Sequence, residues 1–311
     1  METYVGIDIA KYTFDLCCLP EQKMQQFENN AEGIRKAIKV ITKLQPKLVV
    51  MEATGGYEVL LAAELHAAKL PVAVVNPRRI RDFAKANGQL AKTDKLDSEA
   101  IALFAARMQP PAQKQIDHNC RLMKALVARR HQLIRMRTAE NNRREHAIDT
   151  AIARSLNRIL KTIDREIQDV EQLIRDQLAT MPELKATAQI LDSAPGIGET
   201  TATMLVTEVP ELGRLNRRQI AMLVGVSPIN RDSGTFRGKR MTGAGRRDVR
   251  ARLYMPTLVA TRHNPVICRF YERLLANGKT KMTAIIACMR KLITILNIMA
   301  AKNELWNTKF A

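Results

Sequence analysis

The sequence has no paired cysteine motif and no cysteine–histidine cluster. Its five cysteines, at positions 17, 18, 120, 268 and 288, form no CxxC pair, and none of the five histidines stands at zinc-ligand spacing from a cysteine. This argues against both a disulfide framework and a zinc site. We expect reduced, buried thiols and a cytoplasmic, nucleoid-associated protein.

Long uncharged apolar runs are also missing. The most apolar late stretch, Met282 to Ala300, is interrupted by Arg290 and Lys291, so no run is long enough to span a bilayer. The N-terminus METYVGIDIA lacks a basic segment followed by an apolar one, the pattern of a secretory signal. We therefore expect no membrane association and no secretion.

Acidic residues are few relative to basic ones. The 311 residues include 50 Lys and Arg against 31 Asp and Glu, which gives a net charge of +19 and a pI near 10.0. Such a balance indicates a polyanionic partner, of which nucleic acid is the favoured one. A ribosome-associated or merely soluble basic protein is the alternative. The 46% hydrophobic content is ordinary for a folded chain of two domains.

Residues 1–110 alternate between strand and helix patterns. Short β-branched runs predict strands, and apolar residues at spacings of three and four predict helices. The predicted strands are 4–9, 13–19, 25–28, 48–51 and 72–75, and the predicted helices are 31–44, 57–68 and 78–86. The first three strands suggest an antiparallel meander, and the following βαβα order favours a mixed sheet flanked by helices.

Residues 111–184 predict a long helical segment, because neither proline nor glycine occurs between Pro111 and Pro182. Six apolar residues recur at spacings of four and three, the seam of a coiled coil: Leu156, Leu160, Ile163, Ile167, Val170 and Ile174. The seam is interpreted as an oligomerisation or spacer hairpin. The alternative is a pair of helices that pack within their own domain, and intersubunit contact is only slightly favoured because the seam is short.

Residues 185–311 have a mainly helical pattern and open with Pro195-Gly196-Ile197-Gly198 between two predicted helices. This is similar to the hairpin of a helix-hairpin-helix, in which small residues let backbone amides approach a DNA phosphate. Gly196 and Gly198 are therefore candidate nucleic-acid contacts. An ordinary glycine-containing loop before a helix is the alternative.

Four carboxylates stand where a solvated acid is not expected. Asp8 lies within an apolar strand, Glu52 ends another, and Asp94 and Asp97 are spaced to share one face of a helix. A buried carboxylate must be paired, protonated or bound to a metal. Each acid alone has a structural alternative, such as a turn, a helix cap or a solvated position. Together the four can surround one or two magnesium ions, which prefer oxygen ligands.

Three segments, Gly6–Lys11, Met51–Tyr57 and Lys92–Asp97, resemble motifs of the RuvC-like DEDD transposases of insertion sequences, a family that includes the pilin-gene DNA invertases. The resemblance covers almost the whole chain. It implies a RuvC-like (RNase H-like) domain over 1–110 and a transposase domain over 185–311, on either side of the coiled-coil segment that the apolar spacing predicts over 111–184. It also implies that four carboxylates bind the catalytic Mg²⁺, which Mn²⁺ can replace. These metal-binding and catalytic residues are Asp8, Glu52, Asp94 and Asp97.

The segment from Ser227 to Arg252 is glycine-rich and strongly basic, with eight Lys or Arg against two Asp between Arg231 and Arg252. Such a loop can approach a phosphate backbone closely. In the resembled family, the serine of the motif similar to Asp232-Ser233-Gly234 is the nucleophile that attacks DNA and forms a covalent phosphoserine. That role falls on Ser233, with Ser227 and Thr235 as competing hydroxyls. The candidate nucleic-acid-binding side chains are Arg231, Arg237, Lys239, Arg240, Arg246 and Arg247.

The resemblance further implies a structured guide RNA as partner beside the DNA, and a homo-oligomer, a dimer or tetramer, in which the tetrad of one subunit meets the serine of another. Two other functions remain open at this stage. One is a metal-dependent nuclease or junction resolvase that uses water as nucleophile. The other is a non-catalytic DNA- or RNA-binding protein with a relic tetrad.

Overall fold

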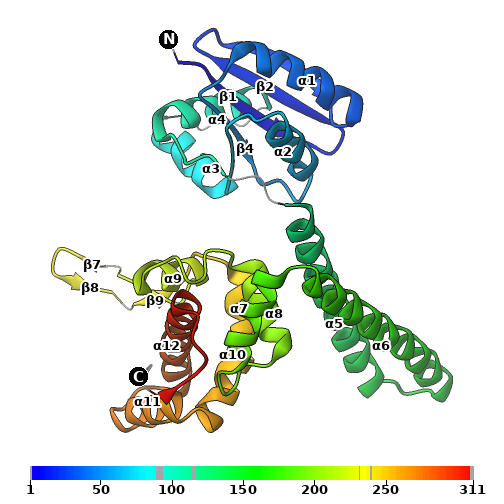
Figure 1. Ribbon diagram of the computed structural model, residues 1–311, viewed down its shortest axis with the longest axis vertical. Helices are drawn as coiled ribbons and strands as arrows, with labels where there is room; N and C mark the ends of the chain where they lie inside the picture. Colours follow the sequence, from blue (N-terminus) through cyan, green and yellow to red (C-terminus); the bar gives the residue numbers. More distant parts are fainter. Residues whose placement is uncertain (1, 89–93, 114–116, 231, 239, 309–311) are drawn as a thin grey trace. The chain divides into compact units, whose positions relative to one another are not determined.

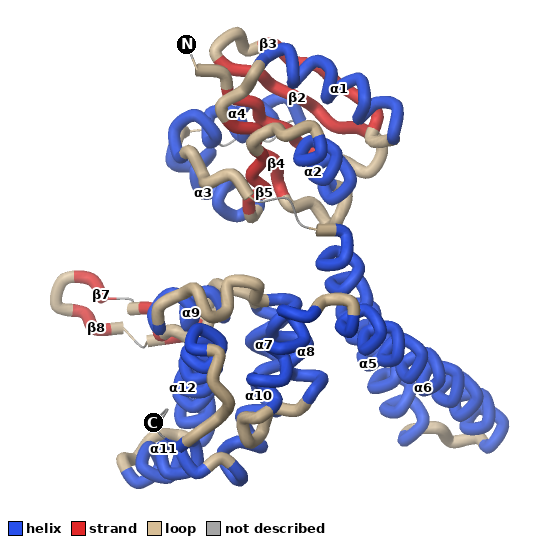
Figure 2. Tube along the Cα trace, viewed as in Figure 1, coloured by secondary structure: helices blue, strands red, loops and turns tan. Residues whose placement is uncertain are grey.

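The computed structural model describes residues 2–88, 94–113, 117–230, 232–238 and 240–308. The chain divides into two compact units, Met1–Asp117 and His118–Ala311. Figures 1 and 2 show the elements of each unit, and each unit is described by itself.

The N-terminal unit contains five strands and four helices in its described residues. In chain order these are β1 (Tyr4–Ile9), β2 (Thr13–Leu19), β3 (Lys23–Glu28), α1 (Ala31–Leu44), β4 (Leu48–Glu52), α2 (Glu58–Ala67), β5 (Val72–Val75), α3 (Pro77–Ala86) and α4 (Asp94–Met108). The strands and helices predicted from the sequence in this region are confirmed to within two residues at each end.

The five strands form one mixed sheet in the order β3-β2-β1-β4-β5. β1, β2 and β3 are antiparallel neighbours, whereas β4 runs parallel to β1 and β5 parallel to β4. The predicted meander followed by βαβ units is therefore confirmed, and β1 is the central strand.

Two helical layers cover the two faces of the sheet, as Figure 1 shows. On one face, α1 and α2 pack on alternate strand residues that include Ile7 and Met51. On the other face, α3 and α4 pack on the intervening residues, among them Tyr4 and Val50. This alternation follows from the period of two in a strand, and it decides which helices each strand side chain faces.

The C-terminal unit is mainly helical. Its helices are α5 (His118–Glu145), α6 (Thr150–Ala179), α7 (Pro182–Asp192), α8 (Glu199–Glu208), α9 (Arg217–Val224), α10 (Arg247–His263), α11 (Pro265–Ala276) and α12 (Lys281–Lys302). Four two-residue strands lie between α9 and α10: β6 (Pro228–Ile229), β7 (Asp232–Ser233), β8 (Phe236–Arg237) and β9 (Met241–Thr242).

Helices α5 and α6 form a hairpin (Figure 2). The turn contains neither proline nor glycine; Asp149 caps α6 by accepting a hydrogen bond from the backbone N–H of Ala151 at 2.6 Å. The predicted apolar seam lies on α6, and from Leu160 to Ile174 its side chains are buried within this chain. The part of the seam from Ile163 to Ile174 packs in one core with Met123, Val127 and Leu133 of α5. The interpretation of this seam as an intersubunit contact therefore gives way to the alternative, a helix pair that packs within its own unit.

Helix α12 supplies much of the core of this unit, with Ile285, Leu292 and Leu296 all buried. By length and composition it is the one described helix that could cross a membrane, but 56% of its apolar window is buried inside the unit. Its apolar character is accounted for by packing against α9, α10 and α11.

Candidate functional site

Asp8 and Glu52 lie at the same level on neighbouring parallel strands. In the register of β1 and β4, Gly6 is opposite Val50 and Ile7 is opposite Met51, so Asp8 and Glu52 each follow directly after a matched pair. Residues two apart in a strand share a face, which places Asp8 with Gly6 and Glu52 with Val50. Both carboxylates are half-buried on the face that α3 and α4 cover.

Helix α4 reaches this face at very close range. A Cβ atom at Gly6 would lie 2.2 Å from the backbone nitrogen of Ala102 and 2.5 Å from the carbonyl oxygen of Ser98. Only glycine therefore allows β1 and α4 to approach this closely. Asp97, half-buried, directly precedes Ser98 on this helix. Asp94 begins α4, and its side chain lies outside the described residues.

The loop after Glu52 is held by a carboxylate that sequence reasoning missed. The side chain of Glu58 accepts hydrogen bonds from the backbone N–H of Thr54 at 3.0 Å and of Gly56 at 2.9 Å. Gly55 and Gly56 have φ angles of 63° and 102°, which few other residues adopt. The backbone N–H of Ala53 also bonds to the carbonyl of Val75 at 3.0 Å. These bonds fix the end of β4 and thereby the position of Glu52.

A further acid, Asp15, lies on the same face of the sheet as Asp8. Asp15 on β2 is the register partner of Asp8, and residues directly opposite in an antiparallel pair point to the same face. Its side chain accepts a hydrogen bond from Gln26 of β3 at 3.1 Å. The signal in the sequence was the position of Asp15 between Phe14 and Leu16, both fully buried. Two carboxylates directly opposite each other repel, and a bound cation relieves that repulsion.

The chemistry of these donors fits a hard divalent cation. Asp8, Glu52 and Asp97 offer only carboxylate oxygens, the ligands that magnesium and manganese accept. Among the side chains that the structure describes, no group of three or more His, Cys, Asp or Glu is arranged so that it could hold a metal ion. Asp94 is not among these side chains, because its own lies outside the described residues.

Ser233 lies at the tip of a β-hairpin in the C-terminal unit. β7 and β8 pair antiparallel, with Asp232 opposite Arg237 and Ser233 opposite Phe236, and Gly234 has a φ angle of 55° in the turn. The side chains of Asp232, Ser233 and Thr235 are exposed. Outside this hairpin, β6 pairs with β9 and closes the base of the ribbon. The sequence indicated a glycine-rich loop here, and in the structure the described part of this loop is a narrow ribbon that presents the hydroxyl to solvent.

The predicted basic contacts around Ser233 differ in their surroundings. Arg240 and Arg247 are exposed. Arg246 is half-buried and donates to both carboxylate oxygens of Glu211 at 2.6 Å and to the carbonyl of Glu208 at 2.9 Å. Arg231 and Lys239, and the side chain of Arg237, lie outside the described residues.

The two glycines predicted to contact DNA have different roles in packing. Gly196, with a φ angle of 97°, lies against α10, where an added Cβ would be 2.7 Å from the Cβ of Ala260. Gly198 is exposed at the N-terminus of α8, with no atom near the position of an added Cβ. The free backbone approach that phosphate binding needs is therefore available at Gly198, whereas Gly196 is required for the packing of α10.

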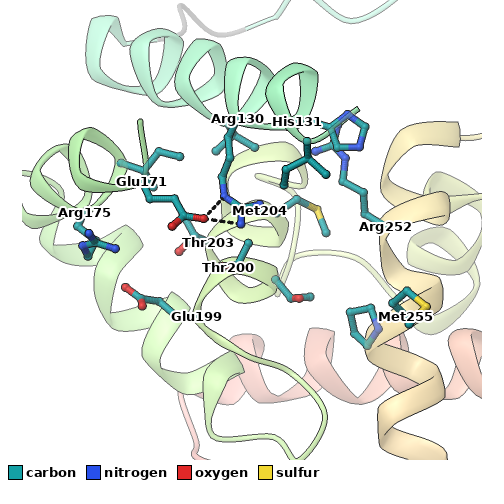
Figure 3. A pocket seen from close by; sticks show the side chains of 15 residues that line it. Arg130, His131, Glu171, Arg175, Glu199, Thr200, Thr203, Met204, Arg252 and Met255 are labelled. Carbon is teal, nitrogen blue, oxygen red and sulfur yellow. Dashed lines mark hydrogen bonds and ion pairs between the residues drawn. The ribbon is translucent and has the colours of Figure 1, made fainter. Parts of the chain in front are cut away.

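A cavity of about 450 Å³ lies where the α5–α6 hairpin meets α8 and α10. Figure 3 shows the side chains that line it, among which Arg130 of α5 bonds to Glu171 of α6 at 2.7 Å. Arg252, another lining residue, forms an ion pair with Glu208. Burial, and then the neighbouring Arg252, lower the pKa of His131. None of the predicted site residues lines this cavity, which lies between the hairpin and the rest of the C-terminal unit.

Two segments of the chain match known transposase families. Residues 5–153 match a family described as Transposase, of the DEDD IS110 type, and residues 188–272 match the Transposase IS116/IS110/IS902 family. The pilin gene-inverting protein of Moraxella bovis is 30% identical over 97% of each chain. The transposase for insertion sequence element IS1328 of Yersinia enterocolitica is 24% identical over 75% of each chain. The chain belongs to the IS110 family of transposases, enzymes that recombine DNA.

Proposed function

We propose that this transposase cuts and rejoins DNA by attack of the Ser233 hydroxyl on a phosphodiester, assisted by a divalent cation at Asp8, Glu52, Asp94 and Asp97. The observation that carries the proposal is the register of β1 and β4, which puts Asp8 and Glu52 side by side on the face covered by α4. Helix α4 bears the other two acids.

The N-terminal unit is proposed to be RNase H-like. The support is the sheet order β3-β2-β1-β4-β5, with an antiparallel meander joined to parallel strands and helices on both faces. The chain is then read in three parts: a metal-binding domain over 1–110, a coiled-coil segment over 111–184 and a serine-bearing transposase domain over 185–311. The close packing of α5 and α6 supports the middle part.

Membership of a DEDD transposase family points to use of a divalent metal ion. We take the metal to be magnesium, with manganese able to replace it, because the proposed donors are all carboxylate oxygens. When bound, such an ion stabilises negative charge on the oxygens of a phosphate under attack. The half-buried positions of Asp8 and Glu52 keep these carboxylates out of bulk water, which strengthens their attraction to a cation.

In the proposed reaction, the Oγ atom of Ser233 forms a bond to phosphorus and loses its proton. The phosphorus–oxygen bond to the neighbouring nucleotide breaks, and the departing oxygen takes up a proton. The energy of the phosphodiester is kept in the phosphoserine, so a second DNA hydroxyl can reverse the attack and reseal the strand. This conservation is what distinguishes strand exchange from hydrolysis.

Residues around the hairpin are proposed to hold the DNA. Arg240 and Arg247 are exposed cations within the Ser227–Arg252 segment, and Arg231, Arg237 and Lys239 belong to the same basic segment in the sequence. Their charges neutralise phosphates, so binding weakens as salt rises. Gly198 adds a close backbone approach at the start of α8.

DNA is the partner that the family membership and the inverting relative support. We further propose a structured guide RNA, a homo-oligomer in which the serine of one subunit serves the carboxylates of another, and a cytoplasmic, nucleoid-associated location. The net charge of +19 supports a nucleic-acid partner. The carboxylates belong to one compact unit and Ser233 to the other. This division supports a site that is assembled between subunits.

The test is to detect a covalent protein–DNA adduct with wild-type protein and with Ser233→Ala. We expect the adduct in the wild type and a complete loss in Ser233→Ala, while Ser227→Ala and Thr235→Ala, which remove neighbouring hydroxyls, keep it. An enzyme that uses water as nucleophile would cut DNA equally well with Ser233→Ala and would form no adduct. That result would replace the serine mechanism with the nuclease alternative.

A further inference from the structure

Two adjoining hollows lie on the surface of helices α11 and α12. One, of about 280 Å³, is lined by Val266, Arg269, Phe270, Arg273 and Lys291. The other, of about 550 Å³, shares Phe270 and Lys291 and extends along α12 to Arg290 and, on α9, Arg217. We call Arg217, Arg269, Arg273, Arg290 and Lys291 the Phe270 basic surface. Helix α12 contacts both α9 and α11, so residues more than 70 positions apart in the sequence meet here (Figure 1).

The Phe270 basic surface concentrates positive charge in five cations. No described acidic residue lines either hollow, and within the described part of the chain no ion pair involves any of the five cations. Arg269 and Arg273 are four residues apart on α11 and exposed, a spacing at which like charges destabilise a helix. Burial, and then repulsion by Arg273, lower the pKa of Lys291. Such crowding costs stability unless an anion binds.

Phe270 holds the cations in place. The guanidinium of Arg273 lies 5.3 Å from the centroid of the Phe270 ring, and the ammonium of Lys291 lies 5.0 Å from it. Both distances are within the range of a cation–π interaction. Two cations already contact the half-buried ring, so a base that stacked on Phe270 would have to displace them. The surface therefore suits phosphates rather than bases.

We propose that the Phe270 basic surface binds the phosphodiester backbone of duplex DNA, as a second contact separate from the serine hairpin. Two basic hollows that share one wall match a ligand in which charged groups repeat along a strand, as phosphates do. DNA is chosen because the family to which the chain belongs recombines DNA. Because the contacts come from cations, and Phe270 already carries two of them, the contact is insensitive to base sequence and positions the duplex.

The experiment measures the affinity of the full chain for a duplex of random sequence over a range of salt concentrations. Arg269→Gln/Arg273→Gln removes two exposed cations, and we expect the slope of log affinity against log salt to fall by about 2, with a loss of affinity of roughly three- to tenfold at moderate salt. The matched control is Lys39→Gln/Lys43→Gln, which removes an exposed pair with the same spacing on α1. Lys291→Gln should reduce the slope by about 1 more.

Unchanged affinity and slope, or a loss no larger than that of the Lys39/Lys43 control, would overturn the proposal. A loss seen only with RNA of equal length, and not with duplex DNA, would overturn it as well. The proposal does not depend on the serine mechanism. Ser233→Ala should keep the wild-type salt dependence, and Arg269→Gln/Arg273→Gln should still form the covalent adduct when protein is added at saturating concentration.

Discussion

Gly6 of β1 lies directly against Ala102 of α4, so closely that a Cβ atom on Gly6 would be 2.2 Å from the backbone nitrogen of Ala102. This contact joins the strand that carries Asp8 to the helix that carries Asp94 and Asp97. The spacing of the proposed metal site is therefore set by a position that has no side chain.

Gly6→Ala should separate β1 from α4. We expect a loss of stability of about 1–3 kcal/mol, the usual range for overpacking, and a loss of cleavage larger than the fraction unfolded explains. Thermal unfolding followed in parallel with DNA cleavage checks both effects. Gly243→Ala is the control for stability, since only the Cδ1 atom of Ile229, at 3.9 Å, comes near its added Cβ. Wild-type cleavage by Gly6→Ala would show that this contact does not set the site.

Asp15→Asn should weaken the response of the N-terminal unit to divalent cations. Asp15 is directly opposite Asp8, and removing its charge relieves a repulsion of roughly 0.2–1 kcal/mol in the metal-free protein. We therefore expect the variant to be slightly more stable without magnesium and to gain less from its addition. Unfolding temperatures with and without magnesium measure this difference. If magnesium raised the unfolding temperature equally in the variant and the wild type, Asp15 would have no part in the metal site.

Arg246 and Arg247 are adjacent but should behave differently. Arg246 pairs with Glu211 through two hydrogen bonds of 2.6 Å, whereas Arg247 is exposed. We expect Arg246→Gln to lower the free energy of unfolding by about 1–2 kcal/mol, because it breaks charged hydrogen bonds. Arg247→Gln should leave stability unchanged and reduce the salt slope of DNA binding by about 1. The reverse pattern would assign the DNA contact to Arg246.

His131 should make stability depend on pH near neutrality. Burial and then Arg252, Arg135 and Arg130 lower its pKa below the ordinary value of 6.5, while Asp248 opposes them. As pH falls through 6.5 the unfolded chain takes up the proton first, so the folded state loses stability. The unfolding free energy should decline on acidification to a smaller extent in His131→Gln than in the wild type. His66→Gln is a second test, because burial also lowers the pKa of His66, in the N-terminal unit, and the same argument predicts a smaller decline there. Equal declines in wild type and His131→Gln would contradict the assignment.

The elements of the N-terminal unit could be predicted because each has a clear periodicity and a clear boundary. β1 and β4 are short apolar runs, and α1 has a capped start at Asn30 and one apolar face. The register between strands could not be predicted, because it depends on pairing across the sheet. For that reason the sequence pointed to Asp8 and Glu52 separately but did not show that Asp15 stands opposite Asp8.

The C-terminal unit was less predictable. The strands of the serine hairpin have two residues each, too few for any periodicity. The end of α5 has no proline or glycine, and the only signal is the cap at Asp149. The Phe270 basic surface draws its cations from three helices, so no local pattern contains it. The serine hairpin and the Phe270 basic surface therefore depend on tertiary packing, whereas the turn between α5 and α6 has one local signal, the cap at Asp149.

The most direct test of the account is the metal dependence of the covalent adduct at Ser233. We expect no adduct in the presence of a chelator and recovery on addition of magnesium or manganese. Asp8→Asn and Glu52→Gln should also form no adduct, even though Ser233 is intact and the variants are folded. Adduct formation at the wild-type level by Asp8→Asn, or by wild-type protein in the chelator, would contradict it.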